Sequence, residues 1–416
     1  MTPFDVKKGD IISITGAGGK TTLMFSLAKT LVKKGSVLIA TTTKIFKPKN
    51  EDFIFIYPEE ICNYSPQDNF IHIFCPKINN NKIESASFED LNELKNHFDY
   101  ILIEADGSCG KPLKGWKDNE PCIPSFANKT ISVIDINCIG KNKNDTNIHR
   151  YELYKNQFTS ECNKISEKDL FNYITHAPLF KNFSFSEDNK YLFFNKIYSE
   201  NEFEIFFNLA NKLNFKNIFW GSAIKNEYYK FKTVTPIVLA AGFSKRFNGD
   251  KLKALLKSGN PILEETLNNI STLNFKEKIL IGKDKFSFDL ALKYKFKYFK
   301  NSSSHLGQSQ SVILGSKNAT SDAFMFIPGD MPFLTKDTFL KVIFEFEQKD
   351  MIIVPTLNDR PSPPIIFPRR FQNELLLLSG DNGGREVLKK NKYIKIYVTQ
   401  SQEFSDIDTQ EDLKNI

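Results

Sequence analysis

The apolar run Ala323-Phe324-Met325-Phe326-Ile327-Pro328 ends in Gly329-Asp330-Met331-Pro332, and this junction constrains the fold more than any other segment. An apolar run followed by glycine and aspartate is typical of a buried strand in a parallel sheet that runs out into a loop. Open α/β sheets hold their ligands at the carboxyl ends of their strands. Packing gives no reason for a carboxylate there, whereas Mg²⁺ takes one or two carboxylates together with phosphate oxygens and water. We therefore predict that Asp330 binds Mg²⁺ in a nucleotide site.

The chain is long enough for two domains. At 416 residues it exceeds what one core normally organises, and two α/β domains of about 200 residues each are expected. Apolar runs alternate with helix-like stretches from Ile11 to Trp220, and a second series starts at Pro236. Residues 226–235 between them are charged and aromatic, so we place the boundary near Thr233 and predict three-layer α/β domains over 1–232 and 233–416.

The expected strands are short apolar runs. In the first domain they are 11–15, 36–40, 54–57, 71–74, 100–104, 131–135, 191–195 and 218–220, with a helix over 20–34. In the second they include 237–241, 278–281, 323–327, 351–354 and 394–398.

Composition excludes several classes of function. The net charge of +7 comes from scattered Lys and Arg residues without a dense basic run, so nucleic acid is not an expected partner. No apolar run approaches the roughly twenty residues of a membrane span, and no signal peptide is visible, so a cytoplasmic protein is expected. The six cysteines form no CxxC pair, which makes a structural zinc site unexpected and reduced thiols the simplest interpretation.

A loop rich in small residues follows the first strand of the second domain. Small side chains let the backbone of Ala240, Ala241 and Gly242 approach a base and phosphates closely. Arg246 and Lys251 follow and are placed to neutralise a triphosphate. Far downstream, Asp408 is either a second Mg²⁺ ligand or a helix N-cap, and the local sequence leaves both open.

The second domain resembles the MobA-like nucleotidyltransferases, and within them the molybdenum cofactor cytidylyltransferases. Five motifs of that family occur here in order: 240–251, 307–311 (GQSQS), 329–332 (GDMP), 380–385 (GDNGGR) and 406–413 (DIDTQEDL). The related guanylyltransferases carry a Gly-Gly loop and another tetrapeptide around the metal aspartate, so the resemblance implies cytidine rather than guanosine. A departure is Ser362-Pro363-Pro364, where the family has a Gly-His/Asn-Pro segment.

The resemblance also implies a Rossmann-like domain and a reaction. The terminal phosphate of Mo-molybdopterin attacks the α-phosphate of CTP in line, and pyrophosphate leaves. In that scheme Asp330 and Asp408 hold Mg²⁺, Arg246 and Lys251 hold the triphosphate, and the acceptor is held by Ser309, Asp381 and Arg385.

A second phosphate-binding signal lies near the amino terminus. The run 11–15 leads into Gly16, Gly18 and Gly19, then into Lys20-Thr21 at the start of a helix. Backbone N–H groups of such a loop form an anion cradle, the lysine reaches phosphates, and the threonine can touch Mg²⁺. We predict a P-loop NTPase-like domain that binds a second NTP, ATP or GTP.

Two further segments strengthen this prediction. Thr43 lies just after the second strand, where such folds meet the γ-phosphate or the substrate. The apolar run 101–103 ends in Glu104 and Asp106, and buried strand ends rarely carry acids for packing alone. Either acid is a candidate to hold Mg²⁺ or to position water.

This domain resembles the selenium-dependent hydroxylase accessory proteins of the YqeC type. The shared elements are 16–22, the threonine run to Lys44, 104–108, 111–114, Glu120-Pro121 and His149-Arg150. The resemblance implies a role in maturing selenium-dependent molybdenum hydroxylases, with the apo-hydroxylase as a hypothetical partner, but no defined reaction. Asn195-Lys196-Ile197-Tyr198 stands where relatives often have the guanine-reading Asn-Lys-x-Asp, so guanine selectivity is not expected. An idle thiol is the simpler interpretation of Cys109, and handling of selenium or sulfur the other.

Three hypotheses follow for the whole chain. The first is a maturation protein that fuses an accessory domain to a cytidylyltransferase. The second is a cofactor carrier or insertase without turnover. The third is a sugar-nucleotide pyrophosphorylase, since one fold serves many acceptors.

Overall fold

The computed structural model describes residues 2–48, 53–158, 162–242, 247, 249–398, 401–404, 407 and 410–415. The chain divides into two compact units, Met1–Phe231 and Lys232–Ile416, one residue away from the boundary expected from the sequence. Each unit is described by itself. Both are α/β units built on a mainly parallel sheet, which confirms the predicted fold class.

The first unit is organised by a nine-stranded sheet. Its order is β14 (Glu227–Lys230), β13 (Ile218–Ser222), β12 (Lys190–Asn195), β10 (Lys129–Asp135), β1 (Asp10–Gly16), β8 (Tyr100–Glu104), β2 (Val37–Thr41), β5 (Ile71–Phe74) and β4 (Phe53–Ile56). All neighbours are parallel except β13 and β14. The carboxyl ends of β1, β8, β10 and β12 therefore meet at one edge of the sheet.

Smaller elements surround this sheet. A three-stranded sheet contains β3 (Ile45–Phe46), β7 (Lys82–Ile83) and β6 (Ile78–Asn79), and a two-stranded one pairs β9 (Leu113–Lys114) with β11 (Ile148–His149). The α-helices are α1 (Lys20–Leu31), α2 (Phe88–Leu94), α3 (Tyr151–Gln157), α4 (Glu167–His176) and α5 (Glu200–Lys212).

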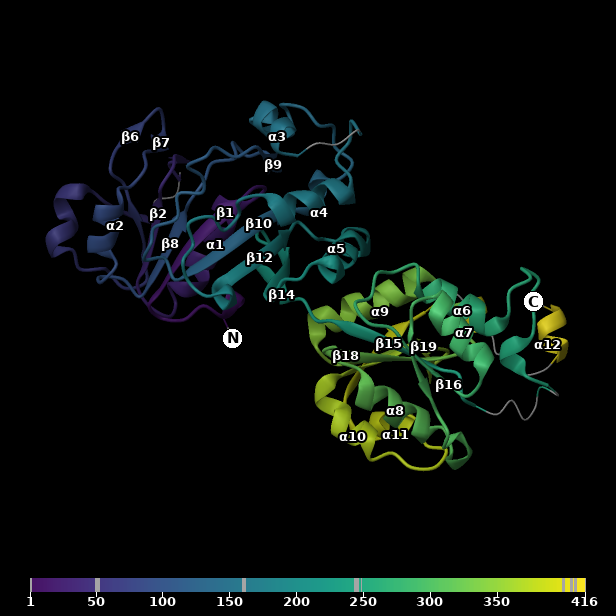
Figure 1. Cartoon of the computed structure of the whole chain (residues 1–416). Coiled ribbons are helices and arrows are strands. Elements are labelled where there is room, and N and C mark those ends of the chain that lie inside the picture. The colour runs from purple at the N-terminus through teal and green to yellow at the C-terminus, as the bar shows by residue number, and fades with distance from the viewer. Residues whose placement is uncertain are drawn as a thin grey trace. The chain divides into compact units, whose positions relative to one another are not determined.

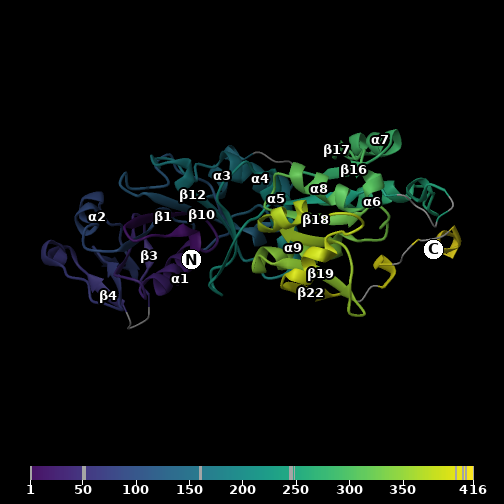
Figure 2. The same ribbon diagram turned by 90° about the horizontal axis from the view of Figure 1, so that it is seen from below.

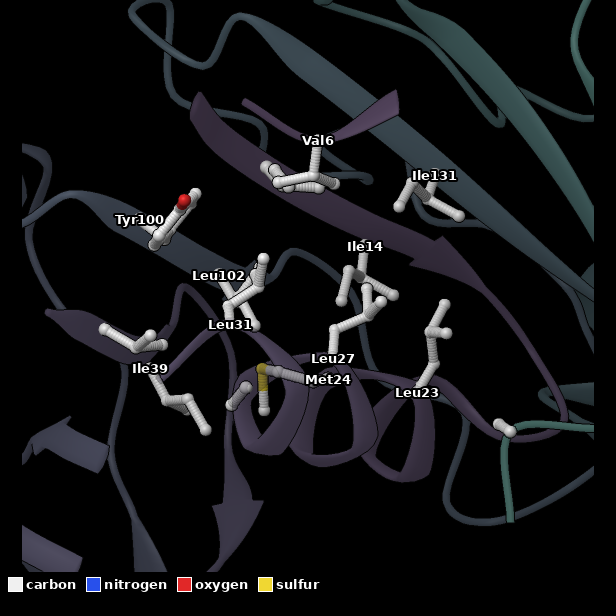
Figure 3. Close-up of a cluster of buried hydrophobic side chains, with 14 of the residues drawn as sticks. Val6, Ile14, Leu23, Met24, Leu27, Leu31, Ile39, Tyr100, Leu102 and Ile131 are labelled. Atoms are coloured by element: carbon white, nitrogen blue, oxygen red, sulfur yellow. The ribbon is translucent and has the colours of Figure 1, made fainter. Parts of the chain in front are cut away.

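Helices cover both faces of the large sheet, as alternation along its strands requires. On one face, Leu23, Met24, Leu27 and Leu31 of α1 pack against residues such as Ile14 (Figure 3). The opposite face carries the remaining strand residues and packs on α2 through Leu91 and Leu94. At the far end of that face, α5 contributes Phe203 and Phe206, which contact Trp220 and Phe194.

One sequence-based expectation for this unit was wrong. Residues 226–235 were expected to separate the two domains, but Glu227–Lys230 form β14, an antiparallel edge strand. Its polar and aromatic composition hid it, because an edge strand has one side without a strand partner and need not be apolar. Tyr228 of β14 packs beside the buried ring of Phe4, which also contacts Phe193 and Phe219.

The second unit has a mixed sheet. Its order is β17 (Lys297–Lys300), β16 (Ile279–Gly282), β15 (Val234–Leu239), β18 (Ala323–Pro328), β21 (Ile365–Pro368), β19 (Ile352–Leu357) and β20 (Arg360–Pro361), with β22 (Tyr393–Tyr397) also paired to β19 (Figure 2). The strand β21 runs antiparallel to β18 and β19 and was not among the expected strands. Its run Ile365-Ile366-Phe367 is apolar, but three prolines precede it closely and obscure the pattern.

The helices of this unit also lie on both faces, with α8 (Ser309–Asn318), α10 (Gln372–Leu376) and α11 (Arg385–Lys390) on one and α6 (Ile262–Ile270), α7 (Lys285–Lys293) and α9 (Lys336–Lys349) on the other (Figure 1). A short helix, α12 (Gln410–Asn415), ends the described chain. None of the helices in the described ranges is long and apolar enough to cross a membrane.

Replacing Phe4 by alanine should destabilise the first unit by about 3–5 kcal/mol, because the ring is fully buried among other aromatic rings. Trp116 and Trp220 are the chain's two tryptophans, and both lie in the first unit, so urea unfolding followed by tryptophan fluorescence monitors that unit within the full chain. Phe46→Ala is the control, because 68% of Phe46 is exposed. Equal unfolding midpoints for the two variants would contradict the packing described for Phe4.

Candidate nucleotide sites

A glycine loop connects β1 to α1 in the first unit. Gly16 has a φ of 90°, and a Cβ atom there would lie 2.3 Å from the carbonyl oxygen of Val133. The backbone N–H of Gly16 donates to Oδ2 of Asp106 at 2.9 Å. Gly16 is therefore fixed between β10 and the loop after β8, and no side chain fits at this position.

The other end of the loop is fixed by Asn195 at the end of β12. Its Nδ2 donates to the carbonyl oxygen of Gly18 at 3.0 Å, and its Oδ1 accepts from the N–H of Ala223 at 2.9 Å. Gly18 and Gly19 have φ values of 83° and 131°, and a Cβ on Gly19 would lie 2.3 Å from Nδ2 of Asn195. The glycines are required by backbone conformation and by close approach.

The Lys20 side chain is buried and folds back over the loop. Its Nζ donates to the carbonyl oxygen of Gly16 at 2.8 Å and to Oγ of Ser108 at 3.2 Å, and it lies 2.9 Å from Oδ1 of Asp106. Burial alone would lower the pKa of Lys20, but the charges of Asp106 and Glu104 outweigh burial and raise it. Lys20 is therefore a charged ammonium group at the helix N-terminus, where anions are favoured.

The two predicted acids have different roles in this arrangement. Asp106 is fully buried and holds the loop through Gly16 and Lys20. Glu104 instead accepts from the hydroxyl of Thr21 at 2.6 Å, and burial raises its pKa. Hydroxyl and carboxylate oxygens are ligands that suit Mg²⁺, so Thr21 and Glu104 form the candidate metal position.

Thr43 is connected through Thr41 to the end of β8. Its Oγ1 is 3.2 Å from Oγ1 of Thr41, which also donates to the backbone carbonyl of Glu104 at 3.1 Å. The structure thus gathers every residue predicted for this site at one edge of the sheet.

A second buried cation lies behind Asp106. The Nζ of Lys114 is 3.6 Å from Oδ2 of Asp106 and 2.7 Å from Oε2 of Glu120, and it lies 4.2 Å from the centre of the Trp116 ring. Arg150 forms a bidentate contact with Glu120: Nη1 donates to Oε2 at 2.6 Å and Nη2 donates to Oε1 at 2.9 Å. Burial would raise the pKa of Glu120, but Arg150 and Lys114 lower it to about 2. Burial lowers the pKa of Lys114 despite its two acidic neighbours.

The sequence singled out the segments of this network but gave them no role. A usable signal was the charge of Lys114 inside the short apolar stretch Leu113–Trp116, since lysine is rarely buried unless it is paired.

Cys109 and His149 are neighbours at the rim of this unit. Sγ of Cys109 is 3.9 Å from Nε2 of His149. Burial, together with the charges of Arg150 and Lys114, lowers the pKa of His149 to about 4. His149 is thus neutral near pH 7 and cannot stabilise a thiolate as an imidazolium would.

In the second unit, Asp330 lies directly after β18, as predicted. Its Oδ2 accepts from Nζ of Lys251 at 2.6 Å. The preceding Gly329 pairs through its N–H with the carbonyl of Leu239 at 3.0 Å, and a Cβ there would lie 3.2 Å from Cβ of Ala240. The carboxyl ends of β15 and β18 therefore bring Asp330, Lys251 and the small-residue loop together.

The backbone of that loop is partly hydrogen-bonded within the unit. The side chain of Ala241 is buried in the hydrophobic cluster of this unit, and the N–H of Ala240 donates to Ile281. The carbonyl of Gly242 accepts from Nζ of Lys283 at 2.8 Å. A base at this loop would meet main-chain atoms of Ala241 and Gly242.

Arg246 and Asp408, two of the predicted catalytic residues, lie outside the described residues. Phe247 and Ile407 are described, and both pack in one small cluster with Ile262 of α6.

The three candidate acceptor residues come from two neighbouring segments. Ser309 begins α8, is buried, and donates its backbone N–H to the carbonyl of Gly380 at 3.2 Å. Asp381 follows Gly380, and Arg385 begins α11; both are exposed. Among the described residues, no group of three or more His, Cys, Asp or Glu side chains is arranged so that it could hold a metal ion.

Comparisons with known families divide the chain in the same way. Residues 12–152 match the model of the YqeC protein family, and residues 236–395 match the MobA-like NTP transferase domain. The first match lies in the first unit and the second in the second unit, which confirms the expected combination.

Two curated relatives and two solved structures represent these matches. The uncharacterized protein YqeC of Escherichia coli (strain K12) is 35% identical over 161 residues, covering 36% of this chain and 60% of that protein, less than two thirds of its length. A probable molybdenum cofactor guanylyltransferase of Aquifex aeolicus (strain VF5) is 28% identical over 191 residues, covering 44% of this chain and 90% of that protein. Molybdopterin-guanine dinucleotide biosynthesis protein A from Archaeoglobus fulgidus is 19% identical with a TM-score of 0.37, covering 44% and 95% of the two chains. A manganese complex of a Mycobacterium tuberculosis protein is 21% identical with a TM-score of 0.36, covering 44% and 97%.

The pKa of Glu120 predicts an acid-sensitive first unit. Because its pKa falls from an ordinary 4.5 to about 2 on folding, Glu120 contributes stability above pH 4.5 that is lost as the pH falls towards 2. This contribution is about 3 kcal/mol at neutral pH. Glu120→Gln should lower the urea midpoint at pH 7 and flatten its pH dependence between pH 5 and 2, followed by tryptophan fluorescence. Glu152→Gln is the control, since that carboxylate is exposed and pairs with Lys155 in the same helix. An unchanged pH slope in Glu120→Gln would contradict the assignment.

Proposed function

We propose that the second unit transfers a nucleotidyl group from a nucleoside triphosphate, with CTP as the donor, to the terminal phosphate of Mo-molybdopterin. Pyrophosphate is the other product. The observation that carries this proposal is the Lys251–Asp330 pair, 2.6 Å apart, beside the Ala240–Gly242 loop at the carboxyl ends of β15 and β18. The MobA-like match over residues 236–395 and the resemblance to a probable molybdenum cofactor guanylyltransferase support the same class of reaction.

Asp330 is the proposed metal ligand, since a partly exposed carboxylate at a strand end suits Mg²⁺. Bound Mg²⁺ supplies charge neutralisation for the triphosphate. Asp408 and Arg246 complete the proposed set from the sequence. Lys251 has a flexible side chain and exchanges Asp330 for a phosphate oxygen when the nucleotide enters.

The acceptor needs positioning rather than activation. An anionic phosphate nucleophile requires no strong general base, so catalysis rests on alignment and charge neutralisation. Ser309 at the start of α8, with Asp381 and Arg385 on the adjoining segments, is proposed to hold the pterin substrate.

The choice of base rests on the loop. Because the Ala241 side chain faces the core, selectivity for cytidine over guanosine would come from how closely the main chain of Ala241 and Gly242 admits a base. The choice of CTP as donor is therefore a separate proposal from nucleotidyl transfer itself, and turnover of a panel of nucleoside triphosphates tests it.

The first unit is proposed to bind a second nucleoside triphosphate, ATP or GTP. Lys20 and the Gly16–Gly19 backbone would hold its phosphates, with Thr21 and Glu104 beside its Mg²⁺ and Thr43 near the terminal phosphate. From the YqeC-type resemblance, this unit would serve the maturation of selenium-dependent molybdenum hydroxylases, with the apo-enzyme as partner.

Asp330→Asn should lower nucleotidyl transfer by at least about 100-fold while leaving the fold intact, because a preorganised charge that stabilises the transferring phosphoryl group is lost. The measurement is pyrophosphate release from Mg²⁺ and CTP, GTP, ATP or UTP with molybdopterin. Asp289→Asn is the matched control, a carboxylate on α7 that pairs with Lys285 at the surface.

The panel also separates the alternatives. GTP turnover with no CTP turnover would replace the cytidylyl proposal by a guanylyl one. Tight pterin retention without pyrophosphate from any nucleotide would indicate a carrier, and turnover with simple sugar phosphates a sugar-nucleotide pyrophosphorylase.

Lys20→Ala should abolish the Mg²⁺-dependent binding of ATP or GTP that calorimetry detects on the full chain, while the binding of CTP by the second unit should be unchanged. The buried ammonium group contacts the loop at the Gly16 carbonyl, and its loss removes this positive charge from the proposed phosphate site. Lys29→Ala, at an exposed lysine of the same helix, should bind like the wild type. Unchanged binding of ATP or GTP in Lys20→Ala would refute the first-unit site.

A further inference from the structure

The ammonium group of Lys20 is already engaged in this structure. It donates hydrogen bonds to the Gly16 carbonyl and the Ser108 hydroxyl, and it forms an ion pair with Oδ1 of Asp106 at 2.9 Å. To reach a phosphate, Lys20 must give up at least part of its contact with Asp106. Asp106 is fully buried, and a buried carboxylate left without a cation is strongly unfavourable.

Asp106 has a second cation within reach. Lys114 approaches Oδ2, the oxygen that also accepts from the Gly16 N–H, whereas Lys20 contacts Oδ1. The two lysines therefore face different oxygens of one carboxylate, Lys20 at 2.9 Å and Lys114 at 3.6 Å. When Lys20 leaves, Lys114 and the Gly16 N–H remain.

Lys114 is kept available by its other neighbours. It is fully buried on β9 against Trp116, so it cannot turn to solvent. Glu120, its other acidic partner, is already held by both guanidinium nitrogens of Arg150. Three cations and three carboxylates thus balance in this cluster: Lys20, Lys114, Arg150, Glu104, Asp106 and Glu120.

We propose that Lys114 is a positioning residue for the first nucleotide site: it takes over the charge of Asp106, so that Lys20 is released to bind the polyphosphate of a nucleotide. The inference rests on the proposed function of the first unit. Glu120 and Arg150 hold Lys114 in reach of Asp106, and Asp106 keeps the loop in place through Gly16 while the lysines exchange. Lys114 itself does not contact the ligand.

The test is a double-mutant cycle on the full chain with Mg²⁺ and inorganic tripolyphosphate, which carries no base. The first-unit site is defined as the binding that Lys20→Ala removes. Lys114→Met keeps an unbranched side chain, one atom shorter, but removes its charge. It should weaken this binding about tenfold, because Lys20 is then retained by Asp106. Asp106→Asn keeps an oxygen that can accept from Gly16 but no longer retains Lys20, and it should bind at least as tightly as the wild type.

The double variant Asp106→Asn/Lys114→Met decides between positioning and mere packing. If Lys114 acts through the charge of Asp106, the double variant should bind within about threefold of Asp106→Asn alone. An equal loss in Lys114→Met and in the double variant overturns the inference, as packing of Lys114 on Trp116 would then be responsible. A tenfold loss in Asp106→Asn alone overturns it as well, and this variant serves even if Lys114→Met fails to fold, which tryptophan fluorescence reports. Wild-type protein without any Lys20-dependent binding overturns the proposed function, and the inference with it.

Discussion

The carboxylate of Asp106 is the interaction on which the first unit depends. It lies where β8 ends beside β1, and it contacts both the beginning of the glycine loop and the lysine that closes it. A charge buried at this depth is stable only with cations and hydrogen-bond donors around it. The presence of Lys20, Lys114 and, one step further, Arg150 follows from this requirement. The conformation of the glycine loop therefore depends on the same carboxylate as the ionic cluster.

The candidate site of the second unit also lies at the carboxyl ends of parallel strands, but its acid–lysine pair is more exposed to solvent. Its acid and lysine, Asp330 and Lys251, form one pair whose carboxylate side chain is 34% exposed, whereas the Asp106 side chain is fully enclosed. The buried Lys20–Asp106 pair holds the glycine loop in one conformation before any ligand binds. A partly exposed pair can be opened by the ligand and its metal at little cost, because water already screens it. The topology of parallel strands sets where both sites lie, and burial sets how each would respond.

The parts of the molecule that follow local rules were predictable from the sequence. Apolar runs located the central strands, and glycine and acid signals at their ends located both candidate sites, because parallel strands bring their carboxyl ends to one edge. The edge strand β14 was missed because its residues are polar and aromatic. The antiparallel strand β21 was missed because three prolines closely precede its apolar run. The Lys114–Glu120–Arg150 network was also missed as a unit. Its members are separated by up to 36 positions in sequence, and only the pairing of β9 with β11 brings them together.

The amide group of Asn195 has a consequence beyond the loop that it holds. It joins the carbonyl of Gly18 to the N–H of Ala223, the residue directly after β13. From there the hairpin of β13 and β14 leads to Phe231, the last residue of the first unit. The Gly18 peptide and the start of the hairpin that precedes the second unit therefore share one side chain as their hydrogen-bond partner. Two hydrogen bonds and a short stretch of chain thus connect the glycine loop to the first residue of the second unit.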